Sequence, residues 1–414
     1  MEAIVLAGGL GTRLRSAVPD LPKCMAPVAG KPFLSFVIDS LRMQGVQRFV
    51  FSLGYKAEVI QQYLKDDYPS LDYACAIETT PLGTGGAIKY ALEHCLAEDV
   101  IIANGDTLFE VRLDDMLHLH TLNQSVCTLA LKPMQHFDRY GVVELDEHNR
   151  ILSFKEKQYY EEGLINGGLY LLKKANFLEH DFPEVFSFEK DFLEKFTALS
   201  PFYGCIQDGY FIDIGIPQDF EKAQSDLKPQ PLDLEKVNPE WTLFLDRDGV
   251  INDEQVGSYV LNWEGFHFSA GVLEAMPVLS GKFGKIIIIS NQRGVGRGLM
   301  TEEDLKNIHK RLVSEVEKAG GRIDHILYCT EKDNTCFFRK PNPGMALQAR
   351  KLFPEIDLKK TIMVGNKPSD MRFGRAAGAF TVFLTTTNKN EPFPHPDVDL
   401  RFNTLLDFAL ALQS

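Results

Sequence analysis

The 414-residue sequence contains no apolar run long enough to span a membrane as a helix. Met1 leads straight into the strand-like stretch 3–7, without the basic and apolar regions of a secretory leader. The seven cysteines are odd in number and scattered, which does not fit the framework of a secreted disulfide-rich protein. Low-complexity tracts and short internal repeats are missing as well. We therefore expect a cytoplasmic protein that does not bind a membrane.

Basic residues are scarce in the first half of the chain. Residues 1–228 hold 21 Lys and Arg against 33 Asp and Glu, whereas residues 229–414 hold 23 against 24. Binding to the phosphate backbone of a nucleic acid needs Lys and Arg that displace its counterions. The acidic first half therefore argues against a nucleic acid as the partner.

Strand-like runs such as AIVLA, RFVFSLGY and DVIIANGD alternate with helix-like stretches such as FLSFVIDSLRMQG. This alternation predicts a largely parallel sheet flanked by helices. It stops at KPQPLDLEKVNPE, which holds three prolines, and restarts with WTLFLD, KIIIISN and TIMVGN and helix-like stretches at 302–320 and 343–352. We predict the α/β class with two doubly wound domains, 1–228 and 241–414, and a linker at 229–240.

The stretch LAGGLGTRL places glycines at 8, 9 and 11 after the first strand-like run, followed by Arg13. Glycine lets the backbone pass close to a ligand, and its N–H groups can point at phosphate oxygens. Such a turn alone is weak evidence, because tight strand-to-helix turns also need glycine for structural reasons.

Three charged residues farther along strengthen this interpretation. Lys23 lies in a loop with several prolines, and Asp106 and Asp213 each end a strand-like run. In open α/β sheets, ligands bind beyond the carboxyl ends of the strands, where an aspartate can hold a metal ion.

Residues 1–228 resemble the sugar-1-phosphate nucleotidyltransferase family, and within it the guanylyltransferases that act on D-glycero-α-D-manno-heptose 1-phosphate. The resemblance rests on AGGLGTRLR, DLPKCMAPVAGKPFL, PLGTGGAI, NGDTLF, YGVVELD, INGGLYLL and FIDIGIP, in family order. It implies a Rossmann-like domain in which a sugar phosphate oxygen attacks the α-phosphorus of GTP in line. That reaction needs alignment and charge neutralisation rather than a covalent nucleophile.

The resemblance also implies residues for each ligand. GTP would be bound by Leu6, Ala7, Gly8, Gly9, Gly11, Thr12, Arg13, Lys23, Gly83 and Asp106, with Arg13 and Lys23 catalytic. Mg²⁺ would be held by Asp106 and Asp213 and would offset charge on the attacking and leaving oxygens. Heptose 1-phosphate would lie near Gly141, Glu156, Lys157 and Asn166. Gly141 could instead be only a turn glycine, and Glu156 only a surface partner of Lys157.

The stretch FLDRDGVINDE is an apolar strand-like run that ends in Asp246 and Asp248, with Gly249 directly behind them. Two carboxylates this close repel each other. A divalent cation and a phosphate between them would explain the pair, and so would one carboxylate that attacks while the other carries a proton. An N-cap aspartate before a helix explains only one of the two. Later strand-like runs and loops add Ser290, Asn291, Arg339, Lys340, Asn366 and Asp370.

Residues 241 to about 390 resemble the haloacid dehalogenase superfamily of phosphohydrolases, and within it the heptose 1,7-bisphosphate 7-phosphatases and the related histidinol-phosphatases. The resemblance implies a Rossmannoid fold in which Asp246 becomes an aspartyl phosphate and Asp248 acts as general acid and then general base. Ser290 and Asn291 would bind the phosphoryl group, and Lys340 would stabilise its charge. The metal, Mg²⁺, would be held by Asp246, Asp248, Asn366 and Asp370, and the retained sugar phosphate would be bound by Arg293, Arg339 and Lys367.

Two features depart from the phosphatase pattern. The family usually has aspartate where this chain has Asn366, which leaves the metal loop one carboxylate short. Many relatives also carry a zinc loop with four Cys or His ligands, of which this chain keeps only Cys329 and Cys336. Because structural zinc takes four ligands, we predict that no zinc is bound.

Taken together, the motifs predict a bifunctional enzyme that uses heptose 1,7-bisphosphate, heptose 1-phosphate and GTP. One alternative keeps both reaction types but changes the substrates to a hexose 1-phosphate and another small ester such as histidinol phosphate. A second alternative is a first domain that only senses sugar nucleotides, and a third is a phosphatase domain made inert by Asn366. The sequence leaves the oligomeric state open.

Overall fold

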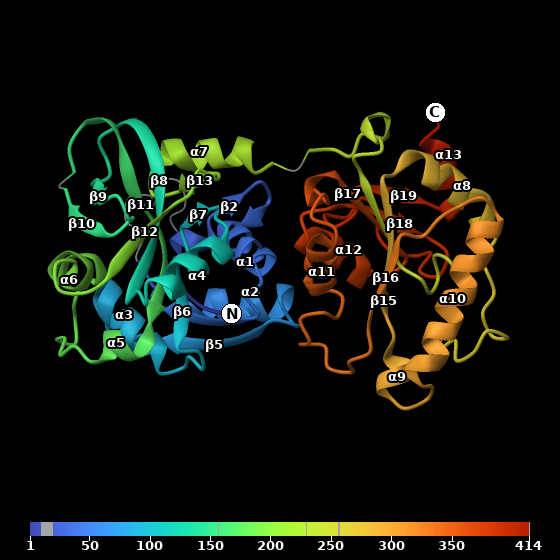
Figure 1. Cartoon of the computed structure of the whole chain (residues 1–414), viewed down its shortest axis with the longest axis horizontal. Helices are drawn as coiled ribbons and strands as arrows, with labels where there is room; N and C mark the ends of the chain where they lie inside the picture. The colour runs from blue at the N-terminus through green and yellow to red at the C-terminus, as the bar shows by residue number, and fades with distance from the viewer. Residues whose placement is uncertain (10–19, 156, 229, 256, 414) are drawn as a thin grey trace. The chain divides into compact units, whose positions relative to one another are not determined.

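The structure is a computed structural model that describes residues 1–9, 20–155, 157–228, 230–255 and 257–413. It divides into two compact units, Met1–Pro229 and Gln230–Ser414 (Figure 1). Within the described residues, no helix has both the length and the apolar character needed to cross a membrane.

The first unit contains a seven-stranded mixed sheet. Strand β1 lies between β4 and β6 and runs parallel to both, and β11 runs antiparallel to both β6 and β8. The strand order is β12 (Phe202–Ile206), β8 (Cys127–Phe137), β11 (Tyr160–Lys173), β6 (Asp99–Asn104), β1 (Glu2–Leu6), β4 (Arg48–Leu53), β5 (Asp72–Ile77). The predicted parallel sheet is thus present from β6 to β5, and β11 is the antiparallel addition.

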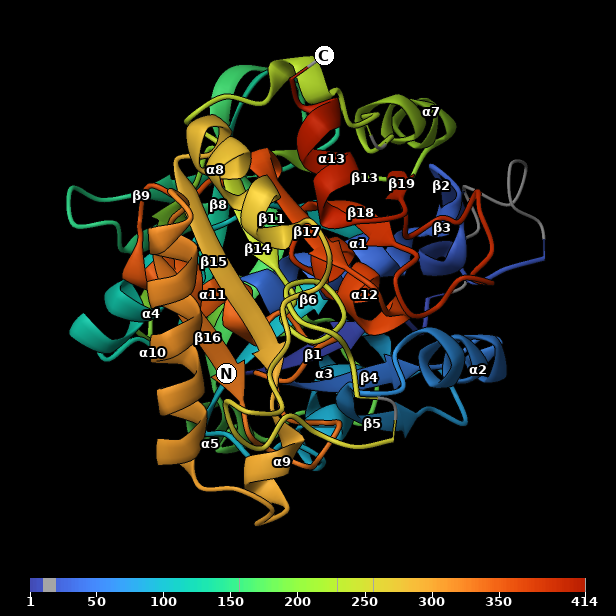
Figure 2. The same ribbon diagram turned by 90° about the vertical axis from the view of Figure 1, so that its right-hand side faces the viewer.

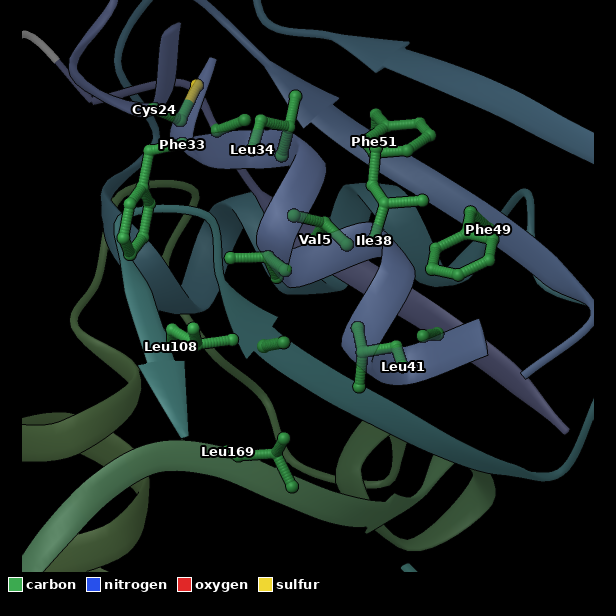
Figure 3. Packing of buried hydrophobic residues seen from close by; sticks show 14 of the residues in the cluster. Val5, Cys24, Phe33, Leu34, Ile38, Leu41, Phe49, Phe51, Leu108 and Leu169 are labelled. Atoms are coloured by element: carbon green, nitrogen blue, oxygen red, sulfur yellow. The ribbon is translucent and has the colours of Figure 1, made fainter. Parts of the chain in front are cut away.

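Helices cover both faces of this sheet, because side chains alternate along each strand. In β1, Ala3 and Val5 enter one core and Ile4 enters the other. Figure 3 shows Val5, Phe49 and Phe51 packed against α1 in the first core. That face carries α1 (Phe33–Met43), α2 (Ala57–Asp67), α4 (Leu113–Leu122) and α7 (Pro217–Asp226); the other carries α3 (Gly83–Leu92), α5 (Lys174–Leu178) and the π-helix η3 (Phe188–Leu193).

Short elements complete the first unit. The strands β7 and β13 pair antiparallel with each other, and so do β2 with β3 and β9 with β10. Their bounds are β2 (Pro27–Val28), β3 (Lys31–Pro32), β7 (Thr107–Phe109), β9 (Val143–Leu145), β10 (Ile151–Phe154), β13 (Phe211–Asp213), η2 (Lys23–Met25) and α6 (Glu194–Phe196).

The second unit contains a six-stranded sheet in which every pair is parallel. Its order is β16 (His325–Cys329), β15 (Lys285–Asn291), β14 (Thr242–Leu245), β17 (Thr361–Gly365), β18 (Phe380–Leu384), β19 (Leu400–Phe402), as Figure 2 shows across the sheet. One face carries α8 (Val272–Lys282), α10 (Glu302–Lys318) and α13 (Leu405–Ala411), and the other carries α11 (Gly344–Leu352) and α12 (Pro368–Ala376) (Figure 1). Short turns are α9 (Arg293–Gly296), η4 (Leu234–Lys236) and η5 (Leu358–Lys360). The predicted α/β class with two doubly wound domains is confirmed.

The helix α10 illustrates why these segments form helices. Thr301 caps its first turn, accepting a hydrogen bond from the backbone N–H of Asp304 while the Asp304 side chain accepts from the N–H of Thr301. Leu305, Ile308 and Leu312 recur at helical spacing and are buried on the sheet side. The helix ends two residues before the end of the predicted range 302–320.

The segment predicted as a linker contributes to the second core. Leu232 and Val237 are buried in the same cluster as Trp241, and Asp233 caps the short turn η4. Described residues from 230 onward therefore pack on the second unit rather than forming free chain.

Candidate active sites

A cleft of about 850 Å³ opens at the carboxyl ends of the central strands of the first unit. The residues that follow β1, β4, β5 and β6 line it, as expected for an open α/β sheet. Predicted site residues in its wall are Leu6, Ala7, Gly8, Gly9, Lys23, Gly83, Asp106, Lys157 and Asp213. The structure thus brings together segments that lie up to two hundred residues apart.

Lys23 lies between the two predicted metal-binding aspartates. Its Nζ is 2.5 Å from Oδ2 of Asp106 and 3.2 Å from Oδ1 of Asp213. The two carboxylates meet because β7 and β13 pair, with Asp213 opposite Thr107. Burial works to lower the pKa of Lys23, but attraction to both carboxylates outweighs it and raises that pKa. The lysine is therefore held in its charged form.

Two glycines allow close backbone contacts at this cleft. A Cβ on Gly8 would lie 3.1 Å from the backbone N of Gly54, which is tighter than a normal contact. Gly83 has φ +72° at the start of α3, and a Cβ there would lie 2.5 Å from the carbonyl oxygen of Phe186. Side chains at either position would push apart the strand ends and the helix that form the wall.

The cleft also contains a carboxylate that sequence reasoning did not single out. Glu78 directly follows β5, and its carboxylate accepts hydrogen bonds from Oγ of Ser52 at 3.3 Å and from the backbone N–H of Leu82 at 3.1 Å. The position was detectable in the sequence, because Glu78 ends a strand-like run in the same way as Asp106. Glu189 lines the cleft too, bonded to Oγ1 of Thr84 at 2.7 Å.

Some predicted residues fall elsewhere. Gly11, Thr12, Arg13 and Glu156 lie outside the described residues. Gly141 and Asn166 lie within the described residues but do not line the cleft. Asn166 donates to the Tyr170 hydroxyl at 3.0 Å and accepts from the Gly168 N–H at 3.0 Å, where β11 changes register. A Cβ at Gly141 would lie 2.4 Å from the Lys155 carbonyl oxygen, which gives that glycine a structural reason.

The second unit places Lys340 between two buried carboxylates at the carboxyl end of β14. Lys340 Nζ is 2.8 Å from Oδ1 of Asp246 and 2.8 Å from Oδ1 of Asp370, and it donates to the Ile289 carbonyl oxygen at 2.7 Å. Attraction to these carboxylates raises the pKa of Lys340 against the opposing effect of burial. Burial and repulsion from Asp370 raise the pKa of Asp246 to about 6, although Lys340 acts in the opposite direction.

Asp248 is held by a different set of donors. The Nη2 atom of the fully buried Arg247 lies 2.8 Å from Oδ1 of Asp248, and Gln292 donates to its Oδ2 at 2.9 Å. The same Gln292 amide donates to Oγ of Ser290 at 2.8 Å. Burial works to raise the pKa of Asp248, but Arg247 and these hydrogen bonds outweigh it and lower that pKa. Asp248 is therefore ionised in this state.

Asn291 positions the lysine. Its side-chain amide donates to the carbonyl oxygen of Lys340 at 3.0 Å and accepts from the Lys340 N–H at 3.1 Å. This pair of bonds joins the end of β15 to the loop that carries Lys340.

The loop after β17 contains an amide with an unpaired oxygen. Asn366 is fully buried, and its Nδ2 donates to Oε2 of Glu254 at 3.1 Å and to Oγ1 of Thr387 at 2.9 Å. Its Oδ1 has no hydrogen-bond partner within the described part of the chain. Glu254 also pairs with Lys367, Oε1 to Nζ at 2.6 Å. An orphaned buried oxygen is costly unless a ligand meets it.

Asp370 has neither oxygen free. Oδ1 contacts Lys340, and Oδ2 accepts from the backbone N–H groups of Asn366 at 3.2 Å and Lys367 at 3.1 Å. The carboxylate therefore ties the Asn366 loop to the lysine. Across the described residues, no three His, Cys, Asp or Glu side chains converge as a ready-made metal site. A cation would take its remaining ligands from amide, backbone, phosphate or water oxygens, as Mg²⁺ commonly does.

Arg293 and Arg339 both reach the loop 330–336. Arg293 donates to the Lys332 carbonyl oxygen at 3.2 Å and to Asn334, and Arg339 donates to the Glu331 carbonyl oxygen at 3.1 Å. Burial and repulsion from Arg293 lower the pKa of Arg339. In each arginine, Nε is buried without a partner among the described residues. Two close guanidinium groups with spare donors can bind an anion.

In the second unit, the predicted residues Asp246, Lys340 and Asp370 form one contact set, and Asp248 and Ser290 form another through Gln292. Sequence reasoning did not single out Arg247, Gln292 or Glu254. Arg247 could have been found as the residue between the two aspartates, but Glu254 lies in an irregular loop with no strand directly before it. Cys329 and Cys336, the two cysteines at the position of the relatives' zinc loop, are free thiols whose Sγ atoms lie 3.9 Å apart.

Comparisons with known proteins agree with two separate sites. The family model described as nucleotidyl transferase matches residues 2–230, and the one described as polynucleotide kinase 3 phosphatase matches residues 244–410. D-glycero-alpha-D-manno-heptose 1-phosphate guanylyltransferase of Aneurinibacillus thermoaerophilus is 51% identical over 228 residues, which cover 55% of this chain and 99% of that protein.

Two solved structures are also similar. HddC from Yersinia pseudotuberculosis, crystallised with GMP-PN, is 39% identical with a TM-score of 0.51 and covers 55% of this chain and 99% of its own. D,D-heptose 1.7-bisphosphate phosphatase from B. bronchiseptica, crystallised with magnesium and phosphate, is 24% identical with a TM-score of 0.39 and covers 42% of this chain and 98% of its own. From the family match over residues 2–230 and the high identity across that unit, the chain belongs to the nucleotidyl transferase family, and it is an enzyme that carries a phosphatase domain after its nucleotidyltransferase domain.

Proposed function

We propose that this enzyme makes GDP-D-glycero-α-D-manno-heptose in two steps. The second unit removes the 7-phosphate from D-glycero-α-D-manno-heptose 1,7-bisphosphate. The first unit transfers GMP from GTP to the resulting 1-phosphate and releases pyrophosphate. The observation that carries the proposal is the 51% identity of the first unit to a heptose 1-phosphate guanylyltransferase, in a chain that also holds a phosphatase site.

The order of steps follows from the chemistry of the substrate. The nucleotidyltransferase needs the anomeric phosphate, because an oxygen of that phosphate attacks the α-phosphorus of GTP. A phosphatase that cut at C1 would destroy this nucleophile. Cleavage must therefore occur at C7.

The transferase site acts by alignment and charge neutralisation. Asp106 and Asp213 fit Mg²⁺, because that ion is usually bound through one or two carboxylates together with substrate phosphates. When bound, Mg²⁺ would offset charge on the attacking and leaving oxygens. Lys23 would exchange its carboxylate partners for phosphate oxygens, and backbone N–H groups of the first glycines would hold the triphosphate. Lys157, in the wall of the same cleft, would bind the sugar phosphate.

Glu78 supports guanine as the base. The Watson–Crick edge of guanine presents N1–H and an exocyclic amino group side by side, and a carboxylate can accept from both. Adenine presents a ring nitrogen acceptor at the corresponding position, which a carboxylate would repel. Glu78 lies in the cleft near Gly8 and Gly83, two residues predicted to contact the nucleotide.

The phosphatase site would work through an aspartyl phosphate. An Oδ atom of Asp246 bonds to phosphorus while the bond from phosphorus to the C7 oxygen breaks, and that oxygen takes a proton from Asp248. Water then gives a proton to Asp248, attacks phosphorus and releases inorganic phosphate and free Asp246. Lys340 would stabilise negative charge throughout, and Ser290 and Asn291 end β15, the strand next to the one that Asp246 follows.

The protonation state of Asp248 must change during this cycle. Arg247 and Gln292 keep it ionised without substrate, which suits its role as a base toward water. The arrival of a phosphate dianion adds negative charge beside the carboxylate and raises its pKa. The proton needed for the leaving oxygen would therefore be taken up together with the substrate.

Mg²⁺ in this unit would be held by Asp246, by the Asp248 carbonyl oxygen and by Oδ1 of Asn366. The unpaired, fully buried Oδ1 of Asn366 is the observation that fits such a ligand. When bound, the ion would neutralise charge on the transferring phosphoryl group. The retained 1-phosphate would be bound by Arg293 and Arg339, whose Nε groups have no partner in the described chain. Lys367, also predicted to bind it, lies on the loop after β17, where its Nζ contacts Glu254.

One incubation tests the proposal. The purified chain is mixed with the α-1,7-bisphosphate, Mg²⁺ and each nucleoside triphosphate separately, and the products are identified by phosphorus NMR and mass spectrometry. We expect phosphate from C7 and a GDP-heptose with GTP. Faster turnover of a hexose 1-phosphate with a different nucleotide, or of histidinol phosphate, would overturn the substrate assignment.

A further inference from the structure

The loop after β17, predicted to bind the metal of the phosphatase site, carries the buried amide of Asn366, and the carboxylate of Glu254 contacts that amide. Asn366 follows β17, next to β14, and the Asp246 N–H donates to the Val364 carbonyl oxygen at 2.9 Å. Asn366 and Asp246 therefore leave adjacent strands at the same edge of the sheet. A Cβ on Gly249 would lie 2.0 Å from Asn366 Nδ2, which places the turn behind Asp248 directly against the amide.

Glu254 fixes the orientation of this amide. A carboxylate can only accept hydrogen bonds from an amide, so the atom that faces Glu254 Oε2 at 3.1 Å must be the NH₂ group. The second hydrogen of that group goes to Oγ1 of Thr387 at 2.9 Å. Both donors are thus used, and Oδ1 is left as the unpaired atom of a side chain that is 0% exposed.

We propose that Glu254 is a positioning residue that turns Asn366 into a ligand for the divalent cation of the phosphatase site. Glu254 does not touch the cation, but through its hydrogen bond with Asn366 it supplies the negative charge that a ligand carboxylate would supply directly. The same bond presents Oδ1 of Asn366 to the cation. It also holds Lys367 through Oε1 at 2.6 Å, on the same loop. The inference rests on the proposed phosphatase function of the second unit, and it assigns Glu254 no contact with the cation.

The proposal predicts a specific coupling between two substitutions. Glu254→Gln removes the charge and frees the amide to turn, which should weaken cation binding about tenfold, a typical loss when a residue behind a metal ligand is changed. In Asn366→Asp, a carboxylate oxygen takes the place of Nδ2 and faces Glu254, so like charges meet and binding should be no tighter than in the wild type. In Glu254→Gln/Asn366→Asp, the new amide at position 254 donates to the new carboxylate at position 366, and binding should return to the wild-type level or exceed it.

Binding is measured directly, with the whole chain. Bound Mn²⁺ is counted by electron paramagnetic resonance with Mg²⁺ as competitor, in an Asp106→Asn background that weakens the cation site of the first unit in every variant. Glu240→Gln is the matched control, because it removes an exposed glutamate–lysine pair, Glu240–Lys360, in the same unit. Circular dichroism and thermal unfolding confirm that each variant is folded.

Recovery in the double variant supports the positioning role. Wild-type affinity in Glu254→Gln, tighter binding in Asn366→Asp alone, or additive losses in the double variant would each overturn it. Failure of the proposed function would look different. If Mn²⁺ affinity changes in the predicted order across the variants but the wild-type chain releases no phosphate from the heptose bisphosphate, the role of Glu254 stands and the substrate assignment fails.

Discussion

Replacing Lys340 by methionine should destabilise the second unit strongly. The Lys340 side chain is 2% exposed and is shared by Asp246 and Asp370, whose side chains are 7% and 1% exposed. Methionine has similar length but no charge, so the variant would bury two carboxylates without a cation. Breaking a buried pair in this way typically costs about 3–5 kcal/mol, which is a large part of the stability of a domain.

The loss should depend on pH in a defined direction. Burial and repulsion from Asp370 already raise the folded-state pKa of Asp246 above its unfolded value, and loss of the opposing attraction to Lys340 raises it further. A group with a raised folded pKa contributes stability below its unfolded pKa, and that stability is lost as pH rises through the folded pKa. The difference between variant and wild type should therefore be largest near pH 8 and shrink toward pH 4.

Tryptophan fluorescence reports this unit selectively, because Trp241 and Trp263 are the only tryptophans of the chain. Urea unfolding followed by fluorescence at pH 4 to 8 gives the free energy of unfolding for Lys340→Met. Lys360→Met is the control, since Lys360 is 43% exposed and solvent screens its pair with Glu240, so losing that pair should change stability little. A loss in Lys340→Met as small as in the control, or one that does not vary with pH, would refute the reasoning.

Four further results are expected. Asp246→Asn should abolish phosphate release and leave nucleotidyl transfer from the 1-phosphate near the wild-type rate, Asp106→Asn should do the reverse, and loss of both activities in either folded variant would mean that the two sites are not independent. Because burial raises the pKa of Asp246 to about 6, kcat/KM for phosphate release at limiting Mg²⁺ should fall below about pH 6 as this carboxylate, both nucleophile and metal ligand, takes up a proton, and a flat profile down to pH 5 would contradict this. Glu78→Gln should reduce the preference for GTP over ATP by about tenfold, as loss of a charged hydrogen bond would, measured by kcat/KM for each nucleotide. Arg293→Ala should reduce a preference for the α over the β bisphosphate by about ten- to a hundredfold, measured by anomer-resolved phosphorus NMR, and equal rates on both anomers in the wild type would remove the role of this arginine.

The sequence was most informative where a charged residue comes within two positions of the end of a strand. Asp106 and Asp246 were found in this way, because the carboxyl ends of parallel strands meet at one edge of a sheet. The contact of Lys23 with Asp213 could not be predicted in this way, because it depends on the pairing of two three-residue strands, β7 and β13. Strands this short have no recognisable periodicity.

The direction of β11 and the packing of the predicted linker could not be predicted from the alternation of strands and helices, because both depend on long-range contacts. The 14-residue strand β11 pairs antiparallel with β6 and β8, and nothing within its own residues indicates its direction. At 229–240, the prolines predicted a linker, but Leu232 and Val237 bury their side chains in the second core. The partners that decide both outcomes lie far away in the sequence.

Contacts between residues far apart in the sequence also decide which side chain of the second unit can bind a metal ion. The resemblance to the phosphatases implied that Asp370, four residues after Asn366, is a metal ligand. In the structure, its oxygens serve Lys340 and two backbone N–H groups, and the unpaired oxygen near the loop belongs to Asn366. Asp370 has no unpaired oxygen because Lys340, thirty residues earlier in the sequence, contacts it, whereas Oδ1 of Asn366 is left without a partner in the described chain.

Each site places a lysine between two carboxylates, but the two lysines differ in what they can do. The side chain of Lys23 is 16% exposed in an open cleft and its aspartates are 33% and 30% exposed, so a cation and a triphosphate can reach the carboxylates and displace the lysine toward phosphate. Lys340 is 2% exposed and also bonded to the Ile289 carbonyl oxygen, so it has no room to leave. Under the proposed function, Lys23 would release its carboxylates to a cation when substrate arrives, whereas Lys340 would stay in place through the cycle and keep Asp246 charged enough to attack phosphorus. The difference fits the two reactions: a nucleotidyl transfer requires neutralisation that comes with the ligand, whereas an aspartyl nucleophile requires neutralisation that is present before the ligand binds.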